Sequence, residues 1–245
     1  TKEYLKLNPN GVVPTLIHDG VPIIDSSVIL EYLDEAFPEP RLTPSNPLNR
    51  ARMRTWLRYF EEKPTPAVRY PTFNRILIRN YKNLSVKEFE NEANIRPLKT
   101  DFYLQMGQEG FSNADIDGAI RDIRQTVSRM EKQLSRGGDW LLGEQYSLAD
   151  ICVAPLIDRM EDLGYEGLWE EGAPHVTTWF KRIKDRPAYS QAYYYEGGKQ
   201  KYFADLEPMR ISLKRRSLER GGGFHPVSFE ADEELHFIVS DEVEQ

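Results

Sequence analysis

Two short stretches near the start of the chain, Val13-Pro14 and Asp25-Ser26, contain residues that could hold a small peptide. An X–Pro bond adopts the cis form at little cost, and a cis bond at Pro14 would turn the N–H and C=O of Val13 away from a sheet. Those groups could then pair with an extended peptide, as an added strand does. Ser26 stands where a helix would begin, so its N–H could bind a carboxylate. Asp25 could accept hydrogen bonds from an ammonium group.

These residue types also have a purely structural interpretation. Pro14 could be an ordinary proline at a strand edge, and Asp25-Ser26 an ordinary helix cap. Because capping is the commonest use of aspartate and serine at such positions, the spacing alone favours this structural interpretation. The two alternatives stay open at the level of residue spacing.

A β-hairpin and one helix are predicted to carry these residues. Apolar runs over 12–17 and 21–24 flank His18-Asp19-Gly20, and Asp-Gly is a strong hairpin-turn signal. His18 should therefore be exposed in the turn. The following helix, starting at Asp25-Ser26 and ending before Pro38, is apolar around much of its surface and should be well buried.

The remainder reads as a series of helices after a proline-rich linker over 40–47. A helix is predicted from Pro47 to Glu62, and the prolines that follow it should interrupt a straight continuation. These prolines are Pro64, Pro66 and Pro71. Between Tyr70 and Phe111 the pattern is less regular and predicts irregular helices.

Later helices are marked by clearer signals. A core-facing stripe at alternating spacings of four and three predicts a long bundle helix, and it comprises Ile116, Ile120, Ile123, Val127, Met130 and Leu134. Ser147-Leu148-Ala149-Asp150 has the form of a capping box before another apolar run. An amphipathic helix with Val176, Trp179, Phe180 and Ile183 should stop at Arg186-Pro187. Past Asp205, a basic patch from Arg210 to Arg220 precedes an acidic end.

Composition narrows the classes of protein. With 245 residues, 40% hydrophobic and 29% charged, the chain is globular, and its net charge of -7 disfavours general nucleic-acid binding. No apolar run approaches the ~20 residues that span a bilayer. A single cysteine, Cys152, excludes an internal disulfide framework, and this favours a cytoplasmic location. We interpret Cys152 as a buried, inert thiol. The four histidines lack metal-ligand spacing, so no metal site is predicted.

Motifs in a fixed order resemble the glutathione S-transferase superfamily. They are Asn8-Pro9-Asn10-Gly11-Val12-Val13-Pro14-Thr15-Leu16, Asp25-Ser26-Ser27-Val28-Ile29-Leu30-Glu31-Tyr32-Leu33, Tyr146-Ser147-Leu148-Ala149-Asp150-Ile151, and Pro174-His175-Val176 with Trp179, Arg182 and Arg186-Pro187-Ala188. The resemblance covers Thr1 to about Tyr193.

This resemblance implies an α+β, mostly α fold. A partial thioredoxin-like domain, reduced to a β-hairpin plus helix, would occupy 1–39, an all-α domain 40–204, and a C-terminal extension 205–245. It also implies a homodimer. The net charge and the short apolar runs predict neither nucleic acid nor membrane as a partner.

The resemblance further implies glutathione as co-substrate. Val13 would pair with the cysteinyl part, Pro14 would be the cis-proline, and Asp25 and Ser26 would hold the γ-glutamyl end. Asp25 stands where the family more often has glutamate, and its shorter arm is expected to loosen the amine contact. Ser147 and Asp150, in the capping motif, would be folding determinants.

The family's catalytic serine, cysteine or tyrosine lies on a strand that precedes the matched region, so we expect it upstream of Thr1. If the chain began at Thr1, the strand over 13–17 would expose an unpaired edge. The segments 84–90 and 97–99 look like those of the bacterial β-etherase-like group, whose members use glutathione to open aryl ethers. Glutathione thiolate would then displace a phenolate from a hydrophobic substrate. The alternative hypothesis is a non-catalytic interaction or dimerisation module.

Overall fold

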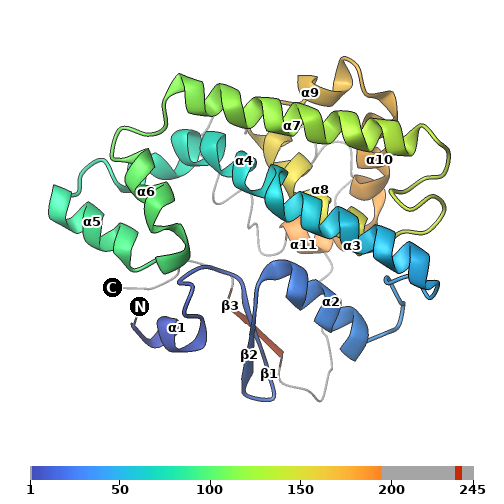
Figure 1. Cartoon of the computed structure of the whole chain (residues 1–245), viewed down its shortest axis with the longest axis horizontal. Coiled ribbons are helices and arrows are strands. Elements are labelled where there is room, and N and C mark those ends of the chain that lie inside the picture. Colours follow the sequence, from blue (N-terminus) through green and yellow to red (C-terminus); the bar gives the residue numbers. More distant parts are fainter. Residues whose placement is uncertain (1, 195–234, 239–245) are drawn as a thin grey trace. The chain divides into compact units, whose positions relative to one another are not determined.

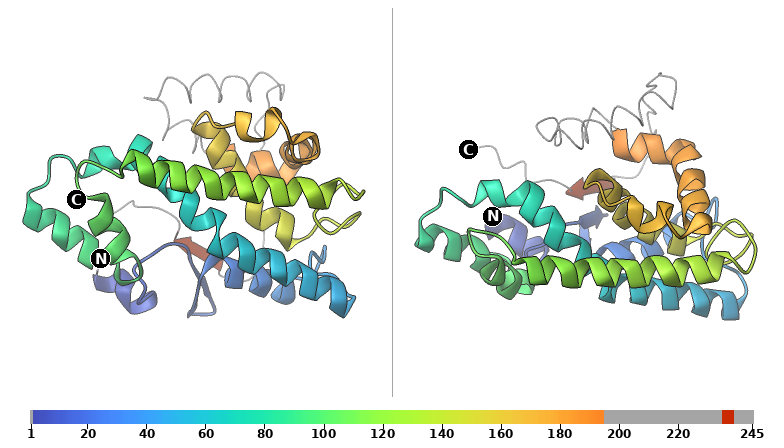
Figure 2. Two further views of the ribbon diagram at one scale, coloured as in Figure 1. Left: turned by 45° about the horizontal axis from the view of Figure 1, so that its top comes forward. Right: turned by 90° about the horizontal axis from the view of Figure 1, so that it is seen from above.

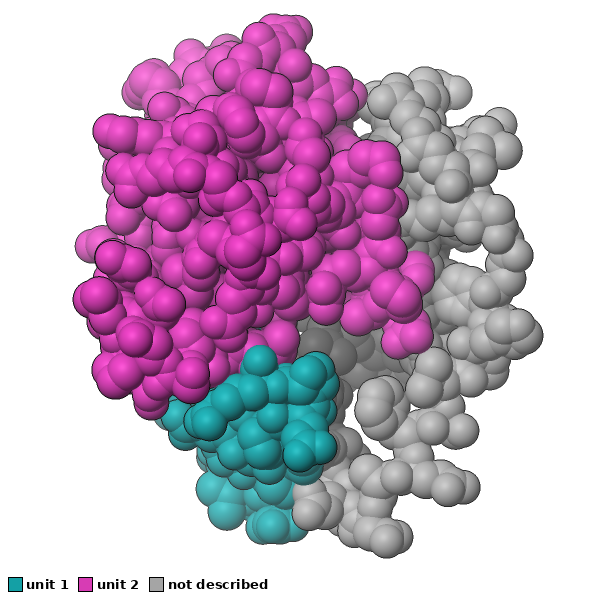
Figure 3. Space-filling model, turned by 90° about the vertical axis from the view of Figure 1, so that its right-hand side faces the viewer, with its two compact units in different colours: residues 1–41, 76–111, 226–245 teal, residues 42–75, 112–225 magenta. Residues whose placement is uncertain are grey.

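A computed structural model describes residues 2–194 and 235–238 of the chain. The chain divides into two compact units, each described separately below (Figure 3). Unit 1 comprises Thr1–Arg41, Ile76–Phe111 and Pro226–Gln245. Unit 2 comprises Leu42–Arg75 and Ser112–His225. The basic patch from Arg210 to Arg220 and the acidic end lie outside the described residues.

Unit 1 is built on the predicted hairpin. Strands β1 (Thr15–His18) and β2 (Val21–Ile24) pair in antiparallel fashion (Figure 1). Asp19 and Gly20 both have positive φ, at 50° and 75°, as a tight hairpin turn requires. The helix α1 (Lys2–Leu7) precedes the hairpin, and α2 (Ser26–Ala36) follows it. The signals Asp-Gly and Asp-Ser therefore predicted the hairpin and α2, in this order, whereas α1 was not predicted.

The inner edge of β1 is covered, contrary to the expectation of an open edge. Strand β3 (Leu235–Ile238) pairs antiparallel with β1 and gives a sheet of order β2-β1-β3. The prediction of an exposed edge was wrong because a segment more than 200 residues away along the sequence takes the place beside β1. Pairing so distant leaves no local signal in the sequence of β1.

The turn histidine is also more covered than its position suggested. The His18 side chain is only 13% exposed. Its Nδ1 lies 2.5 Å from the Tyr32 hydroxyl, and its ring contacts that of Phe37. Since Tyr32 lies in α2 and Phe37 caps its C-terminus, His18 anchors the hairpin to α2, and the prediction of an exposed histidine was wrong.

Unit 1 also contains shorter helices from the middle of the chain. They are η2 (Ile78–Asn80), α5 (Val86–Asn94), η3 (Pro97–Lys99) and α6 (Thr100–Met106). These are the irregular helices predicted between Tyr70 and Phe111. Ser85 and Glu88 form a capping box at the start of α5, which explains why the helix begins there.

Unit 2 is a helical bundle. Its elements are α3 (Pro47–Glu62), α4 (Pro64–Thr72), α7 (Asn113–Leu134), α8 (Leu148–Asp162), α9 (Gly167–Glu170), α10 (Pro174–Asp185) and α11 (Pro187–Tyr194). A π-helical turn, η1 (Phe73–Leu77), follows α4. In Figure 2, α7 runs beside α4, and α3 packs against α8. The largest fully buried side chains include Trp169, Trp179, Phe60 and Phe180.

The predicted helix from Pro47 to Glu62 is confirmed as α3. The predicted interruption is confirmed, because α3 ends before Lys63 and a separate helix, α4, begins at Pro64, with Pro71 inside it. Pro64 and Pro66 lie in the first turn of α4, where the missing N–H groups would have no helical partner. The long stripe is confirmed as α7, with Ile123, Val127, Met130 and Leu134 buried.

The predicted capping box joins several parts of unit 2. Ser147 caps α8, and the Asp150 carboxylate accepts the Ser147 N–H at 3.1 Å. The same carboxylate accepts the Leu141 N–H at 3.0 Å and the Trp179 indole N–H at 2.9 Å. Asp150 is fully buried, and burial raises its pKa despite these hydrogen bonds. One side chain thus holds the start of α8, the preceding loop and α10 together.

Helix α10 receives its cap from another helix. Ala173, at its N-terminus, offers no side-chain acceptor. Glu131 of α7 instead accepts the backbone N–H of Val176 at 3.0 Å and contacts the His175 ring at 2.7 Å. Burial opposes the charge of Glu131, but these hydrogen bonds prevail and lower its pKa. Cys152, expected to be buried, is half-buried in α8.

No helix in the described ranges is both long and apolar enough to cross a membrane. Within the same ranges, no three histidine, cysteine, aspartate or glutamate side chains are grouped so that they could hold a metal ion.

Candidate functional site

The hairpin register brings the predicted site residues to one end of the sheet. Thr15 of β1 pairs with Ile24 of β2. Pro14 and Asp25, the next residues outward, therefore flank the same end, and Val13 and Ser26 follow them. The Val13–Pro14 peptide bond is cis, as expected. The structure thus brings together all four residues that the sequence singled out.

Val13 presents free main-chain groups at this end. The residue is exposed, with 48% of its surface accessible to solvent. Neither its backbone N–H nor its C=O has a hydrogen-bond partner among the described residues. Unpaired backbone groups beside a strand are what an extended peptide needs in order to add to a sheet.

Asp25 acts as a helix cap and still keeps one oxygen for a ligand. Its Oδ1 accepts the backbone N–H groups of Ser27 at 3.0 Å and Val28 at 3.3 Å. Its Oδ2 has no hydrogen-bond partner within the described ranges, and the residue is exposed. The structural and the functional interpretations of Asp25 are therefore compatible, because each uses a different oxygen.

Ser26 is the first residue of α2 and is exposed. In the part of the chain that the structure describes, its N–H and hydroxyl have no partner. A free N–H at a helix N-terminus, where the helix dipole is positive, favours a carboxylate. An ammonium group at Asp25 and a carboxylate at Ser26 would lie side by side, as they do on the γ-glutamyl group of glutathione.

The backbone at Asp25 is unusual. Its φ of 76° and ψ of 123° lie in a region of backbone conformation that residues other than glycine rarely adopt. Such a conformation costs on the order of 1–3 kcal/mol and is concentrated at binding and catalytic sites. This conformation lets β2 end at Ile24 and α2 begin at Ser26, with Asp25 as the single residue between them.

A buried polar network, which the sequence reasoning missed, fixes the loop before Pro14. Asn8 is fully buried, and its amide donates to the Val12 carbonyl at 2.7 Å and to the Thr15 hydroxyl at 3.1 Å. The Tyr4 hydroxyl donates to the same carbonyl at 2.6 Å. Because Val12 precedes Val13, this network holds the main-chain groups of Val13 in place. The Asn-Pro pair at Asn8 was a signal for a turn, but nothing local indicated burial.

The arrangement can therefore hold a short zwitterionic peptide. Main-chain groups of Val13 would align its backbone, Asp25 would hold its amine, and Ser26 its carboxylate. A hairpin and helix with these main-chain groups at one end, joined to a separate bundle, define a partial thioredoxin-like domain followed by an all-helical domain.

Comparisons with known proteins agree with that class. The family model for the N-terminal domain of glutathione S-transferases matches residues 1–41, and the model for the C-terminal domain matches residues 113–182. The chain belongs to the glutathione S-transferase family.

Among the relatives, protein LigF of Sphingobium sp. is 32% identical over 197 residues, which covers 78% of this chain and 76% of LigF. Its crystal structure, that of a beta-etherase, superposes with a TM-score of 0.71, covering 79% of this chain and 82% of LigF. Maleylacetoacetate isomerase of Mus musculus is 30% identical over 162 residues, which cover 66% of this chain and 59% of the length of the isomerase. These relatives bear out the resemblance to the β-etherase-like group and do not favour the hypothesis of a non-catalytic module.

Proposed function

We propose that this protein is a glutathione transferase that cleaves aryl ethers. The observation that carries the proposal is the shared sheet end. There Val13, Asp25 and Ser26 offer groups that have no partner among the described residues and that match the backbone, amine and carboxylate of glutathione. The similarity to LigF, named as a beta-etherase, supports the choice of substrate.

In the proposed step the glutathione sulfur attacks the carbon that bears an aryloxy group. A C–S bond forms while the C–O bond breaks, and the phenolate leaves with the bonding electron pair. The thiol proton passes to solvent. The described residues contribute alignment of the tripeptide, which converts a bimolecular step into one within a complex.

We assign activation of the sulfur to a residue upstream of Thr1, as the family resemblance implies. The hydroxyl groups of Tyr4 and Thr15 lie near the Val13 end, but they are 2.8 Å apart and hydrogen-bond each other. Their role in the proposal is to hold the loop.

The test is an assay of the full-length protein with glutathione and a β-aryl ether of guaiacol. We expect equal amounts of a glutathione thioether and free guaiacol, measured by chromatography and mass spectrometry. A chloronitrobenzene serves as a second electrophile. If only the chloronitrobenzene is converted, the protein is still a glutathione transferase, but the proposal that aryl ethers are its substrates is rejected. No turnover of either, together with no binding of glutathione in calorimetry, would reject the whole proposal.

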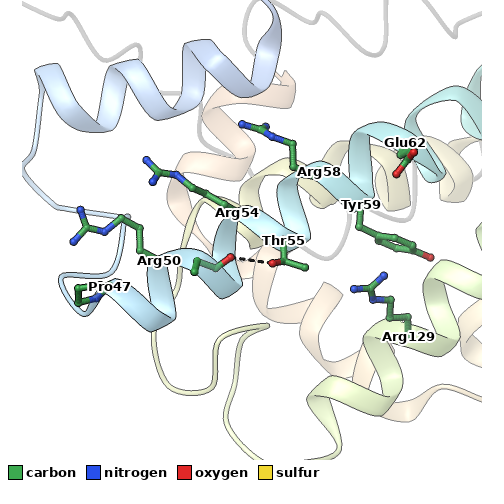
Figure 4. A pocket seen from close by; sticks show the side chains of 9 residues that line it. Pro47, Arg50, Arg54, Thr55, Arg58, Tyr59, Glu62 and Arg129 are labelled. Carbon is green, nitrogen blue, oxygen red and sulfur yellow. Dashed lines mark hydrogen bonds between the residues drawn. The ribbon is translucent and has the colours of Figure 1, made fainter.

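We also propose that the protein forms a homodimer through a basic surface of α3. Arg50, Arg54 and Arg58 follow one another at intervals of four residues and line a hollow of about 890 Å³ (Figure 4). Arg129 of α7 also lines this hollow, and its guanidinium lies 4.0 Å from the centre of the Tyr59 ring. Glu62 is the acidic residue that lines the hollow, and Arg58 contacts Glu61 beside it at 3.4 Å.

The proposed occupant is the acidic N-terminal segment of a second copy. Residues 1–41 carry seven acidic and three basic side chains, counted along the sequence. Opposite charge on two surfaces steers association and fixes its register. A homodimer of this kind is also what the family resemblance implies.

Arg54→Glu should weaken the dimer, because it places an acidic group in the basic surface. We expect the dissociation constant of the dimer to rise at least about tenfold in sedimentation equilibrium, since like charges across an interface cost several kcal/mol. Arg124→Glu is the matched control, because Arg124 is exposed on α7 but lines no part of this hollow. A monomeric unmodified protein, or equal effects of both variants, would contradict the proposed interface.

A further inference from the structure

The segment from Ile76 to Phe111 interrupts unit 2 in the sequence but belongs to unit 1. It leaves the bundle after α4 and returns to it before α7. In Figure 1 its helix α6 lies close to α1, in the same unit. The proposed glutathione site does not explain why a long insertion should pack there.

The contact between this insertion and the glutathione loop is made by main chain. The Leu98 N–H donates to the Asn10 carbonyl at 3.3 Å. A Cβ atom on Gly11 would lie 2.6 Å from the Ile95 carbonyl oxygen and 2.9 Å from the Arg96 Cα. Gly11 also has a φ of +65°. Only glycine fits both the close approach and the positive φ.

Contacts within the insertion fix the position of the stretch 95–98. The Arg96 guanidinium is 3.0 Å from the Glu92 carboxylate and lies 4.9 Å from the centre of the Tyr103 ring. The Arg96 carbonyl accepts the Lys99 N–H at 2.8 Å and the Thr100 hydroxyl at 3.2 Å. The stretch is therefore a fixed wall beside the loop.

This wall carries apolar side chains that remain exposed. Ile95 is 42% exposed and Leu98 62% exposed, and Val13 on the neighbouring loop is 48% exposed. The main-chain contacts with Asn10 and Gly11 place Ile95 and Leu98 beside the loop that leads to Val13. Neighbouring exposed apolar residues mark binding surfaces. Val13 follows Gly11 by two residues, which is about 7 Å of extended chain. A ring placed against the wall would therefore lie near a thiol that pairs with Val13.

We propose that the stretch 95–98 forms the apolar wall of the acceptor site, with Leu98 contacting the aromatic ring of the substrate and Gly11 acting as the positioning residue. This inference rests on the proposed function. The wall and the glutathione loop then form one element, in which the main-chain contact at Gly11 sets the distance between the two reactants.

Leu98→Ser tests the wall. Because removal of an apolar contact of this size weakens binding without touching the glutathione groups, we expect the KM for the aryl ether to rise roughly tenfold. The KM for glutathione should stay unchanged. Leu104→Ser is the matched control, since Leu104 belongs to the same insertion and is 47% exposed. An unchanged ether KM in Leu98→Ser, or an equal rise in Leu104→Ser, would overturn the proposal.

Gly11→Ala tests the positioning contact, with Gly20→Ala as its control. Gly20 has a φ of +75° and no atom within 4 Å of its would-be Cβ. Both variants carry the same conformational cost of roughly 1–2 kcal/mol, so their difference reports the contact with the insertion alone. We expect Gly11→Ala to weaken glutathione binding in calorimetry well beyond Gly20→Ala. Equal affinities would overturn the role of Gly11.

These experiments separate failure of the inference from failure of the proposed function. If the unmodified protein forms no thioether and binds no glutathione, the proposed function fails, and the inference fails with it. If the unmodified protein is active and Leu98→Ser behaves like Leu104→Ser, only the inference fails. If chloronitrobenzene is the sole substrate, the same comparison of KM values is made with that compound.

Discussion

Asp150→Ala should lower the free energy of unfolding by about 3–5 kcal/mol, because several buried donors lose their acceptor together. The donors are the N–H groups of Ser147 and Leu141 and the indole N–H of Trp179. The site is fully buried, so water cannot replace the carboxylate. Since a typical domain is stable by only about 5–15 kcal/mol, unit 2 would lose a large share of its stability.

The chain offers a matched control for this substitution. Ser112 and Asp115 form the same capping box at the start of α7, with Asp115 accepting the Ser112 N–H at 3.0 Å. That box is exposed, so Asp115→Ala should cost only about 1 kcal/mol. Urea unfolding followed by circular dichroism measures both variants. A loss for Asp150→Ala as small as that for Asp115→Ala would show that the buried carboxylate is not a folding determinant.

The sequence predicted those elements whose signals are local. Asp19-Gly20 indicated the hairpin turn because only a few residues tolerate positive φ, and Ser147 with Asp150 indicated the start of α8 because both capping partners lie within one turn. The four candidate site residues also lie at element boundaries, Val13 and Pro14 before β1 and Asp25 and Ser26 at the start of α2. The hairpin register brings them together, and their binding of glutathione stays a prediction.

Contacts between distant parts of the chain were not predictable in this way. Asn8 reads as a turn residue, and its burial depends on Tyr4 and Thr15 closing over it. The packing of 95–98 on Gly11 and the pairing of β3 with β1 each join segments separated by much of the sequence. A single sequence does not reveal such contacts, because the local residue pattern of each segment is the same whether or not the distant segment packs against it.

Asp25→Asn should weaken glutathione binding by roughly 10–100-fold, because a hydrogen bond to a charged group contributes about 1.5–3 kcal/mol. The variant removes the charge that would face the amine and puts an NH₂ donor in place of the free Oδ2. The fold should be kept. Asparagine caps helices about as well as aspartate, it can accept the N–H of Ser27 through its oxygen, and it tolerates positive φ.

Three measurements isolate the contact between Asp25 and the amine. Asp19→Asn is the charge control, since Asp19 is also an exposed acid with positive φ in unit 1. Unfolding in urea must show similar stability for both variants. Calorimetry with cysteinylglycine, which lacks the γ-glutamyl group, completes a double-mutant cycle. Asp25→Asn should weaken glutathione strongly and cysteinylglycine hardly at all. Equal weakening of both peptides would place the amine elsewhere, and Asp25 would then be a helix cap alone.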